Sequence, residues 1–148
     1  MITFTTKYFD ELNAIELYQL LQLRSEVFVV EQTCVYQDLD GKDVKCYHVL
    51  GYENNVLVAG SRLVPPEVSY KYFPSIGRVA THPNARHKGH GKSLMEYSIA
   101  KTKELFQSQT IVISAQSYLD RFYKDLGFIP EGEEYLEDDI PHRKMKLG

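Results

Sequence analysis

Cysteine, long apolar runs and surplus positive charge are all scarce in this chain of 148 residues. The two cysteines, Cys34 and Cys46, lack the spacing of zinc ligands, and we expect reduced thiols rather than a disulfide. No apolar run approaches the roughly 20 residues that span a bilayer. Residues 1–7 lack the apolar stretch of a secretion signal. We therefore expect a cytoplasmic protein without a membrane partner.

The charge balance argues against a nucleic-acid partner. Lys and Arg number 17 against 20 Asp and Glu, which gives a net charge of -3. Such a chain cannot cover nucleic acid with a broadly basic surface, but its charge balance leaves room for a local basic site. Hydrophobic residues make up 43% and charged residues 25%, which is typical of a globular protein. Without repeats or linkers, residues 1–148 are expected to form a single domain.

The hydrophobic pattern predicts a mixed order of strands and helices. The turn 53–55 is suited to a hairpin because Asn tolerates positive φ, and Gly127 is a natural helix end. Strands are expected at 3–8, 47–52, 56–64, 75–81, 111–115 and 142–147, and helices at 13–29 (one or two), 91–106 and 118–126. This order predicts an α/β or α+β fold, with a sheet flanked by helices.

A glycine-containing loop joins the strand at 75–81 to the helix at 91–106. A helix N-terminus presents unpaired N–H groups and about half a positive charge. Gly89 and Gly91 remove the Cβ atoms that would keep an anion away, and Arg86 adds a cationic donor. The loop therefore indicates a phosphate site, with an ordinary tight turn as the alternative.

The spacing excludes two common phosphate loops. A Walker loop needs four residues between its glycines, whereas a single residue separates Gly89 from Gly91. The dinucleotide-binding fingerprint needs a third glycine where Leu94 stands.

The chain from the strand through His82-Pro83 and Arg-x-x-Gly-x-Gly to the helix resembles motif A of the GNAT superfamily of acetyl-CoA-dependent N-acetyltransferases. Residues 122–128 resemble motif B of that family, in which Tyr is followed by Gly-Phe. Residues 23–32, 36–40 and 140–142 resemble its ElaA-like subgroup, so the likeness covers nearly the whole chain. The resemblance implies a mixed, mostly antiparallel sheet whose strands splay at the cofactor site. A homodimer is compatible with it, since many members pair.

The resemblance also implies site residues. The backbone of Val79, Ala80 and Thr81 would hydrogen-bond the pantetheine arm of acetyl-CoA. The pyrophosphate would be held by Arg86, His87, Lys88, Gly89, His90, Gly91 and Lys92. Tyr123 would protonate the departing thiolate, a role suited to a phenol of pKa near 10. Its alternative role is that of a core residue with its hydroxyl at the rim.

The attacking amine must be neutral, yet an amine of pKa about 10.4 is mostly protonated at neutral pH. The sequence does not name the base. Glu31, His48 and His142 are candidates because the resemblance places their regions near the acceptor. Each also has an ordinary interpretation: a charge at a helix end, a hydrogen-bonded strand residue and a surface partner.

Two acidic segments and a group of three histidines are the remaining candidates for binding sites. The loop 38–43 fails the EF-hand pattern, because Lys42 and Val49 stand at ligand positions. We expect a solvated turn there, or else a lip that attracts a cationic amine. The acidic residues of 131–139 are expected to be solvated, or to provide a field suited to a polyamine or basic peptide. His82, His87 and His90 lack an accompanying carboxylate or cysteine, so no metal is expected.

Together these features predict an acetyl-CoA-dependent N-acetyltransferase that moves an acetyl group to a primary amine of a small molecule or peptide by direct attack. One alternative is a CoA-binding sensor or regulatory module without turnover. Another is a phosphate or nucleotide binder unrelated to CoA.

Overall fold

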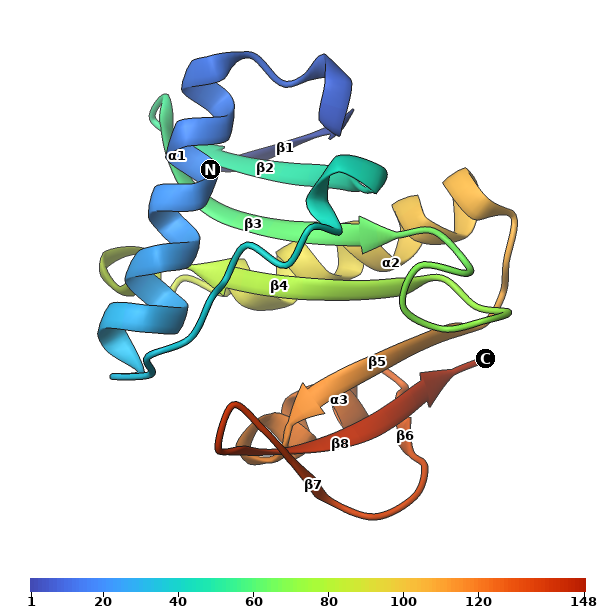
Figure 1. The fold of residues 1–148 in the computed structure, drawn as a ribbon. Coiled ribbons are helices and arrows are strands. Elements are labelled where there is room, and N and C mark those ends of the chain that lie inside the picture. The colour runs from blue at the N-terminus through green and yellow to red at the C-terminus, as the bar shows by residue number, and fades with distance from the viewer.

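The computed structural model describes residues 1–148 and contains two antiparallel sheets (Figure 1). The first has the order β1-β2-β3-β4, formed by β1 (Ile2–Tyr8), β2 (Tyr47–Glu53), β3 (Val56–Val64) and β4 (Ser75–Thr81). The second has the order β5-β8-β6, formed by β5 (Ile111–Gln116), β8 (Ile140–Leu147) and β6 (Ile129–Pro130); β7 (Tyr135–Glu137) also pairs with β8.

Helices cover both faces of the first sheet. In Figure 1, α1 (Ala14–Arg24) crosses in front of β3 and β4, while α2 (His90–Phe106) lies behind them. A short helix, α3 (Asp120–Asp125), packs against β5. No helix combines the length and apolarity that a membrane span requires. The mixed α/β fold expected from the sequence is confirmed.

The helix predicted at 13–29 is continuous but changes its winding. It begins with a capping box, in which the Asn13 side chain accepts from the Glu16 N–H at 2.8 Å and Glu16 accepts from the Asn13 N–H at 2.9 Å. After Arg24 the winding becomes π-helical over Ser25–Glu31. Gly60 lets α1 lie close to β3, because a Cβ there would stand 2.8 Å from Leu20 Cδ1.

The two sheets share one core. Leu94 and Met95 of α2 are fully buried, and they belong to a cluster of 14 buried residues. That cluster draws on the first sheet through residues such as Leu63 and on the second through residues such as Ile113 and Met145. The sheets are therefore held together by side chains rather than by a continuous ladder.

The ladder is interrupted between β4 and β5, which lie side by side and run in the same direction (Figure 1). The backbone hydrogen bond from the Val112 N–H to the Pro74 carbonyl, 3.1 Å long, joins them near their beginnings. Further along, the two strands belong to separate sheets. The splayed strands implied by the sequence resemblance are thus confirmed.

The predicted turns are confirmed, with small shifts in the element bounds. Asn54 and Asn55 have φ of 51° and 64°, as the hairpin between β2 and β3 requires. Gly127, which follows the C-cap Leu126 of α3, has φ of 101°, and the Phe128 N–H donates to the Tyr123 carbonyl at 3.1 Å. The helix predicted at 118–126 begins as a 3-10 turn over Ser117–Leu119, and the last strand begins two residues earlier than predicted.

Candidate active site

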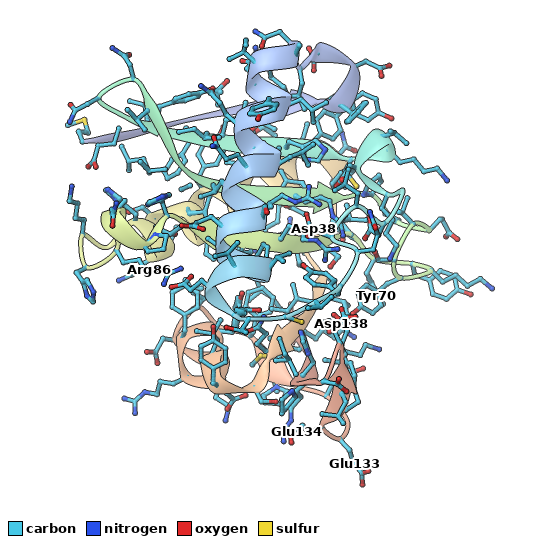
Figure 2. The ribbon with its side chains drawn as sticks, turned by 60° about the vertical axis from the view of Figure 1, so that its left-hand side comes forward. Asp38, Tyr70, Arg86, Glu133, Glu134 and Asp138 are labelled. Atoms are coloured by element: carbon cyan, nitrogen blue, oxygen red, sulfur yellow. The ribbon has the colours of Figure 1, made fainter.

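The opening between β4 and β5 leads into a cleft of 1110 Å³. Both sheets, the loop before α2, the end of the π-helical segment and α3 contribute to its walls. Figure 2 shows Arg86 at one end of the gap between the sheets, and Tyr70 and Asp138 at the other. We call these the loop end and the hairpin end of the cleft.

At the loop end, α2 begins with an N-terminus that no side chain caps. Its first internal hydrogen bond runs from the Ser93 N–H to the Gly89 carbonyl at 3.1 Å, so the preceding N–H groups lack helical partners. Gly89 has φ of 74°, and a Cβ built there would meet nothing within 4 Å. The helix end is therefore open to an anion, as its partial positive charge favours.

Most of the predicted cofactor residues line this cleft. Those that do are Val79, Thr81, Arg86, His87, Gly89, His90, Gly91 and Lys92. Ala80 does not, because neighbouring strand residues face opposite sides and Ala80 packs beneath α1 against Leu23. Lys88 does not line it either: its Nζ lies 3.0 Å from a Glu53 carboxylate oxygen, and His90 Nε2 lies 3.0 Å from the other.

The Glu31 carboxylate is paired with Arg86 of the loop before α2, and Glu31 does not line the cleft. The Arg86 guanidinium donates to both Glu31 oxygens, with an Nη2–Oε1 distance of 2.6 Å, and Arg86 Nε donates to the Thr81 carbonyl at 3.2 Å. The hydrogen bond from Arg86 lowers the pKa of Glu31. A carboxylate held in this way is a weak proton acceptor.

Tyr123 lines the cleft from α3 and is 7% exposed. Its ring lies between Phe122 and Phe128, with centroid distances of 5.1 and 5.9 Å. Burial, and to a smaller extent Tyr118, raises the pKa of Tyr123 to about 12. Its hydroxyl has no hydrogen-bond partner within the protein, so it is a protonated and available donor at neutral pH.

A bulge in β4 contributes Arg78 and Val79 to the lining of the cleft. The pairing of β3 with β4 shifts between Gly60 and Arg62, which gives β4 one extra residue. Arg78 lies there with φ of 48°, an unusual value for a non-glycine residue. Arg78 Nε lies 2.8 Å from Asp38 Oδ1, and Arg78 Nη2 donates to the Asp38 carbonyl at 2.8 Å. Asp38 thus holds the bulge in place.

The expectation of a solvated turn at 38–43 is wrong for its aspartates, which form an ion network with buried arginines. Asp38 and Asp43 are 7% and 8% exposed. Arg24 lies 2.9 Å from an oxygen of each, and Arg62 lies 2.9 Å from Asp40 and 3.0 Å from Asp43. Burial opposes ionisation of Asp40, but the hydrogen bonds from Arg62 outweigh it and lower the pKa of Asp40 to about 2.

The two histidine candidates for the base lie in different surroundings. His48 is 1% exposed beneath the ion network, and its Nε2 lies 2.9 Å from the Asp43 carbonyl. Burial lowers the pKa of His48, and the residue does not line the cleft. His142 does line it, at the hairpin end, with 7% exposure. Of the three candidates, the structure brings His142 alone to the cleft.

Contacts across the opening tie the end of the π-helical segment to the second sheet. The Gln32 and Gln116 amides donate to one another at 3.2 and 3.5 Å. Cys34 Sγ donates to the Asp138 carbonyl at 3.5 Å. Both cysteines are free thiols, as expected, and burial raises the pKa of Cys46 to about 11.

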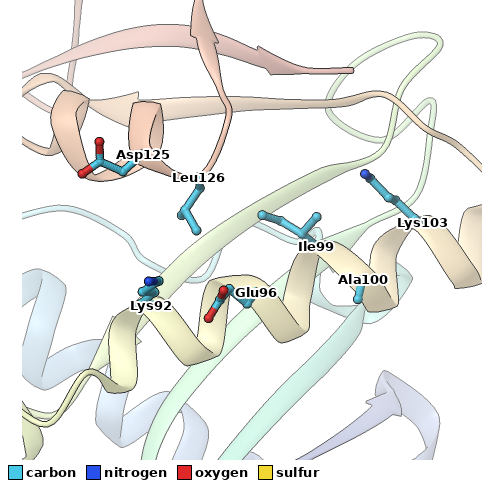
Figure 3. A pocket seen from close by; sticks show the side chains of 7 residues that line it. All are labelled: Lys92, Glu96, Ile99, Ala100, Lys103, Asp125 and Leu126. Atoms are coloured by element: carbon cyan, nitrogen blue, oxygen red, sulfur yellow. The ribbon is translucent and has the colours of Figure 1, made fainter.

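A second hollow of 500 Å³ lies between α2 and α3, outside the cleft (Figure 3). It is lined by Lys92, Glu96, Ile99, Ala100, Lys103, Asp125 and Leu126. Lys92 also lines the cleft and is shared by the two. The hollow contains no tyrosine or histidine that would match the acid and base sought for the chemistry.

The comparisons with known proteins agree with this geometry. The family model for an acetyltransferase (GNAT) domain matches residues 17–148, and the chain belongs to this family. Its members use an acyl-CoA as cosubstrate. Within the family the chain is similar to ElaA of Escherichia coli, whose crystal structure it matches with a TM-score of 0.92 and 37% identity over all of both chains.

Two further relatives are equally similar. An acyl-CoA N-acyltransferase from Pseudomonas aeruginosa matches with a TM-score of 0.94 and 40% identity over all of both chains. A UPF0039 protein of Schizosaccharomyces pombe is 41% identical over 99% of this chain and 97% of its own length. The resemblance drawn from motifs A and B, including the ElaA-like subgroup, is therefore confirmed.

Proposed function

We propose that this protein transfers the acetyl group of acetyl-CoA to a primary amine. The proposal depends on one observation above all. An uncapped helix N-terminus, an interrupted ladder and a largely buried tyrosine whose hydroxyl has no hydrogen-bond partner all border the same cleft. Each of these features suits a different part of an acyl-CoA: the phosphates, the extended amide-containing arm and the thiolate that leaves.

The loop end is proposed to hold the pyrophosphate, through Arg86 and the backbone from His87 to Lys92. Arg86 is already paired with Glu31, so it is positioned before an anion arrives. The edge of β4 at Val79 and Thr81 is proposed to hydrogen-bond the pantetheine amides. Ala80 contributes its backbone alone, since its side chain packs beneath α1.

The chemistry proposed is a direct attack. The amine nitrogen bonds to the thioester carbonyl carbon, and collapse of the tetrahedral intermediate breaks the C–S bond. Tyr123 donates its hydroxyl proton to the thiolate as that bond breaks. A pKa of about 12 keeps the proton on Tyr123 until then, and a buried donor is strong in the low dielectric of the cleft.

The test is a calorimetric titration with acetyl-CoA, with ADP as the control ligand. Tight binding of acetyl-CoA together with weak binding of ADP supports a site that recognises the whole cofactor. A thiol-release assay with benzylamine, cadaverine and a lysine-containing peptide then measures transfer. Binding without transfer to any amine would favour a CoA-sensing module, and equal binding of ADP would favour a nucleotide binder.

A further inference from the structure

The hairpin of β7 and β8 brings two possible proton acceptors together at one end of the cleft. Asp138 and Asp139 form its two-residue turn, with φ of 50° and 62°. The register pairs Tyr135 with His142 and Glu137 with Ile140. Glu137 and His142 are therefore diagonal neighbours across the two strands, and both line the cleft.

The His142 ring is fixed in position. It stacks on Tyr135, with ring centroids 6.2 Å apart and an interplanar angle of 23°. Its Nδ1 lies 2.7 Å from the Ile140 carbonyl oxygen, which can only accept a hydrogen bond. Nδ1 therefore carries the proton in the neutral ring, and Nε2 has a free lone pair.

The free Nε2 lies 3.6 Å from Glu137 Oε2. In the neutral ring both atoms are acceptors, so they do not bond one another. At this separation, one ammonium group can donate to both. We propose that His142 Nε2 and the Glu137 carboxylate form the seat of the acceptor's ammonium group, and that His142 takes its proton. This inference rests on the proposed transfer to an amine.

The charges around this seat favour a cation. Glu137 faces it from β7 and Asp138 from the turn, while Gln116, opposite His142 on β5, is uncharged. From the connection between β3 and β4, Tyr70 contributes a hydroxyl whose pKa is raised to about 12 by burial and then by Tyr135 and Glu137. On β8, Arg143 directly follows His142 and so faces the opposite side of the strand. Lys144, two residues along on the same side as His142, lies over the Tyr70 ring at 5.7 Å.

The proton transfers balance. The ammonium gives one proton to His142 Nε2, which later releases it to solvent, and the neutral amine attacks the thioester. Tyr123 protonates the thiolate as the C–S bond breaks, and the proton remaining on nitrogen returns to the Tyr123 oxygen. The sum converts the ammonium and the thioester into an amide, a thiol and one released proton.

The other candidates do not offer this chemistry. Glu31 is paired with Arg86 and His48 lies outside the cleft. Nothing in the sequence favours one of the three candidate bases over the others. Their contacts in the structure favour His142.

The experiment compares His142→Gln with the wild type in the thiol-release assay, with the fastest amine of the panel, across a range of pH. At pH 7 we expect kcat/KM to fall about 100-fold, as for loss of a general base. Acetyl-CoA affinity should remain within about twofold, which calorimetry measures. The deficit should shrink as pH rises, because solvent then deprotonates the amine.

Glu137→Gln should raise KM for the amine more than it lowers kcat. Its matched control is Glu134→Gln, an exposed carboxylate in the segment just before β7 that does not line the cleft, and this variant should behave as the wild type. A deficit of His142→Gln that is independent of pH, or equal effects of the two glutamate variants, would overturn the inference.

A second measurement needs no acceptor. In 15N-histidine-labelled protein, two-bond proton–nitrogen correlations should show His142, assigned by its loss in His142→Gln, as the Nδ1-protonated tautomer; the Nε2-protonated form would overturn the inference. A wild type that transfers while His142→Gln transfers equally well refutes the inference and leaves the function standing. A wild type that acetylates no amine refutes both.

Discussion

Replacing Gly89 with alanine separates the cost of a strained backbone from the loss of an anion site. Gly89 has φ of 74°, and a Cβ there meets nothing within 4 Å of protein. The cost to folding is therefore the left-handed conformation alone, about 1 kcal/mol for a non-glycine residue. The new methyl group stands beside the uncapped N–H groups of α2. It occupies space that a bound phosphate needs.

The chain offers a matched control in Gly132, which has φ of 85° and where a Cβ would likewise meet no atom within 4 Å. Gly132 lies in the segment between β6 and β7 and does not line the cleft. Gly132→Ala should cost about the same 1 kcal/mol of folding free energy. It should leave acetyl-CoA affinity unchanged.

The two variants should therefore differ in binding. Losing one hydrogen bond to a charged group costs about 1.5–3 kcal/mol, so Gly89→Ala should weaken acetyl-CoA binding about 10- to 100-fold. Gly89→Glu, which adds a negative charge, should abolish it. Urea unfolding measures the folding cost and calorimetry measures the affinity. Equal affinities of Gly89→Ala and Gly132→Ala would refute the phosphate assignment.

Three further predictions concern Tyr123 in the cleft and the ion network of the loop 38–43. Tyr123→Phe should lower kcat about 100-fold or more in the thiol-release assay with little change in acetyl-CoA affinity; unchanged turnover would remove its role as acid. Arg24→Met should cost about 3 kcal/mol in urea unfolding because it removes one of the two arginines that pair with each of the buried carboxylates Asp38 and Asp43, whereas Arg121→Met, with a side chain 92% exposed, should cost almost nothing. The lowered pKa of Asp40 means that its contribution to stability is present above about pH 4 and is lost as pH falls towards 2. Asp40→Asn should therefore unfold with a smaller dependence on acidic pH than the wild type, and identical profiles would contradict the network.

Local patterns in the sequence predicted the parts of the fold that local forces determine. The Asn54-Asn55 turn and the helix end at Gly127 follow from backbone preferences, and both are confirmed. The direction of the Ala80 side chain, away from the cleft, also follows from the period-two rule for strands, which places Val79 and Thr81 on one face and Ala80 on the other. The prediction concerns the backbone of all three residues, so it stays a prediction for Ala80 although its side chain does not reach the cleft.

The ion network could not be predicted from the sequence because its partners are far apart along the chain. Arg24 comes from α1, Arg62 from β3 and Arg78 from β4, and each meets the loop 38–43. An acidic, glycine-containing loop seen alone is typical of a solvated turn. One signal was present: Arg24 and Arg62 stand within apolar segments, where a charged residue requires a partner. Nothing in the sequence around Arg78 indicates its positive φ, because the bulge is set by pairing with β3 and by contacts with Asp38.

The interrupted ladder gives this protein two strand edges that face each other instead of facing solvent. Edge strands ordinarily expose unpaired backbone groups to neighbouring chains, but β4 and β5 turn theirs towards the cleft. An extended ligand that carries amides would complete the sheet, in the manner of an added strand. Occupancy would then show as a gain in thermal stability that grows with ligand concentration. We therefore expect the stability gained on binding to depend on the amide-containing arm of the ligand, and not on its phosphates alone.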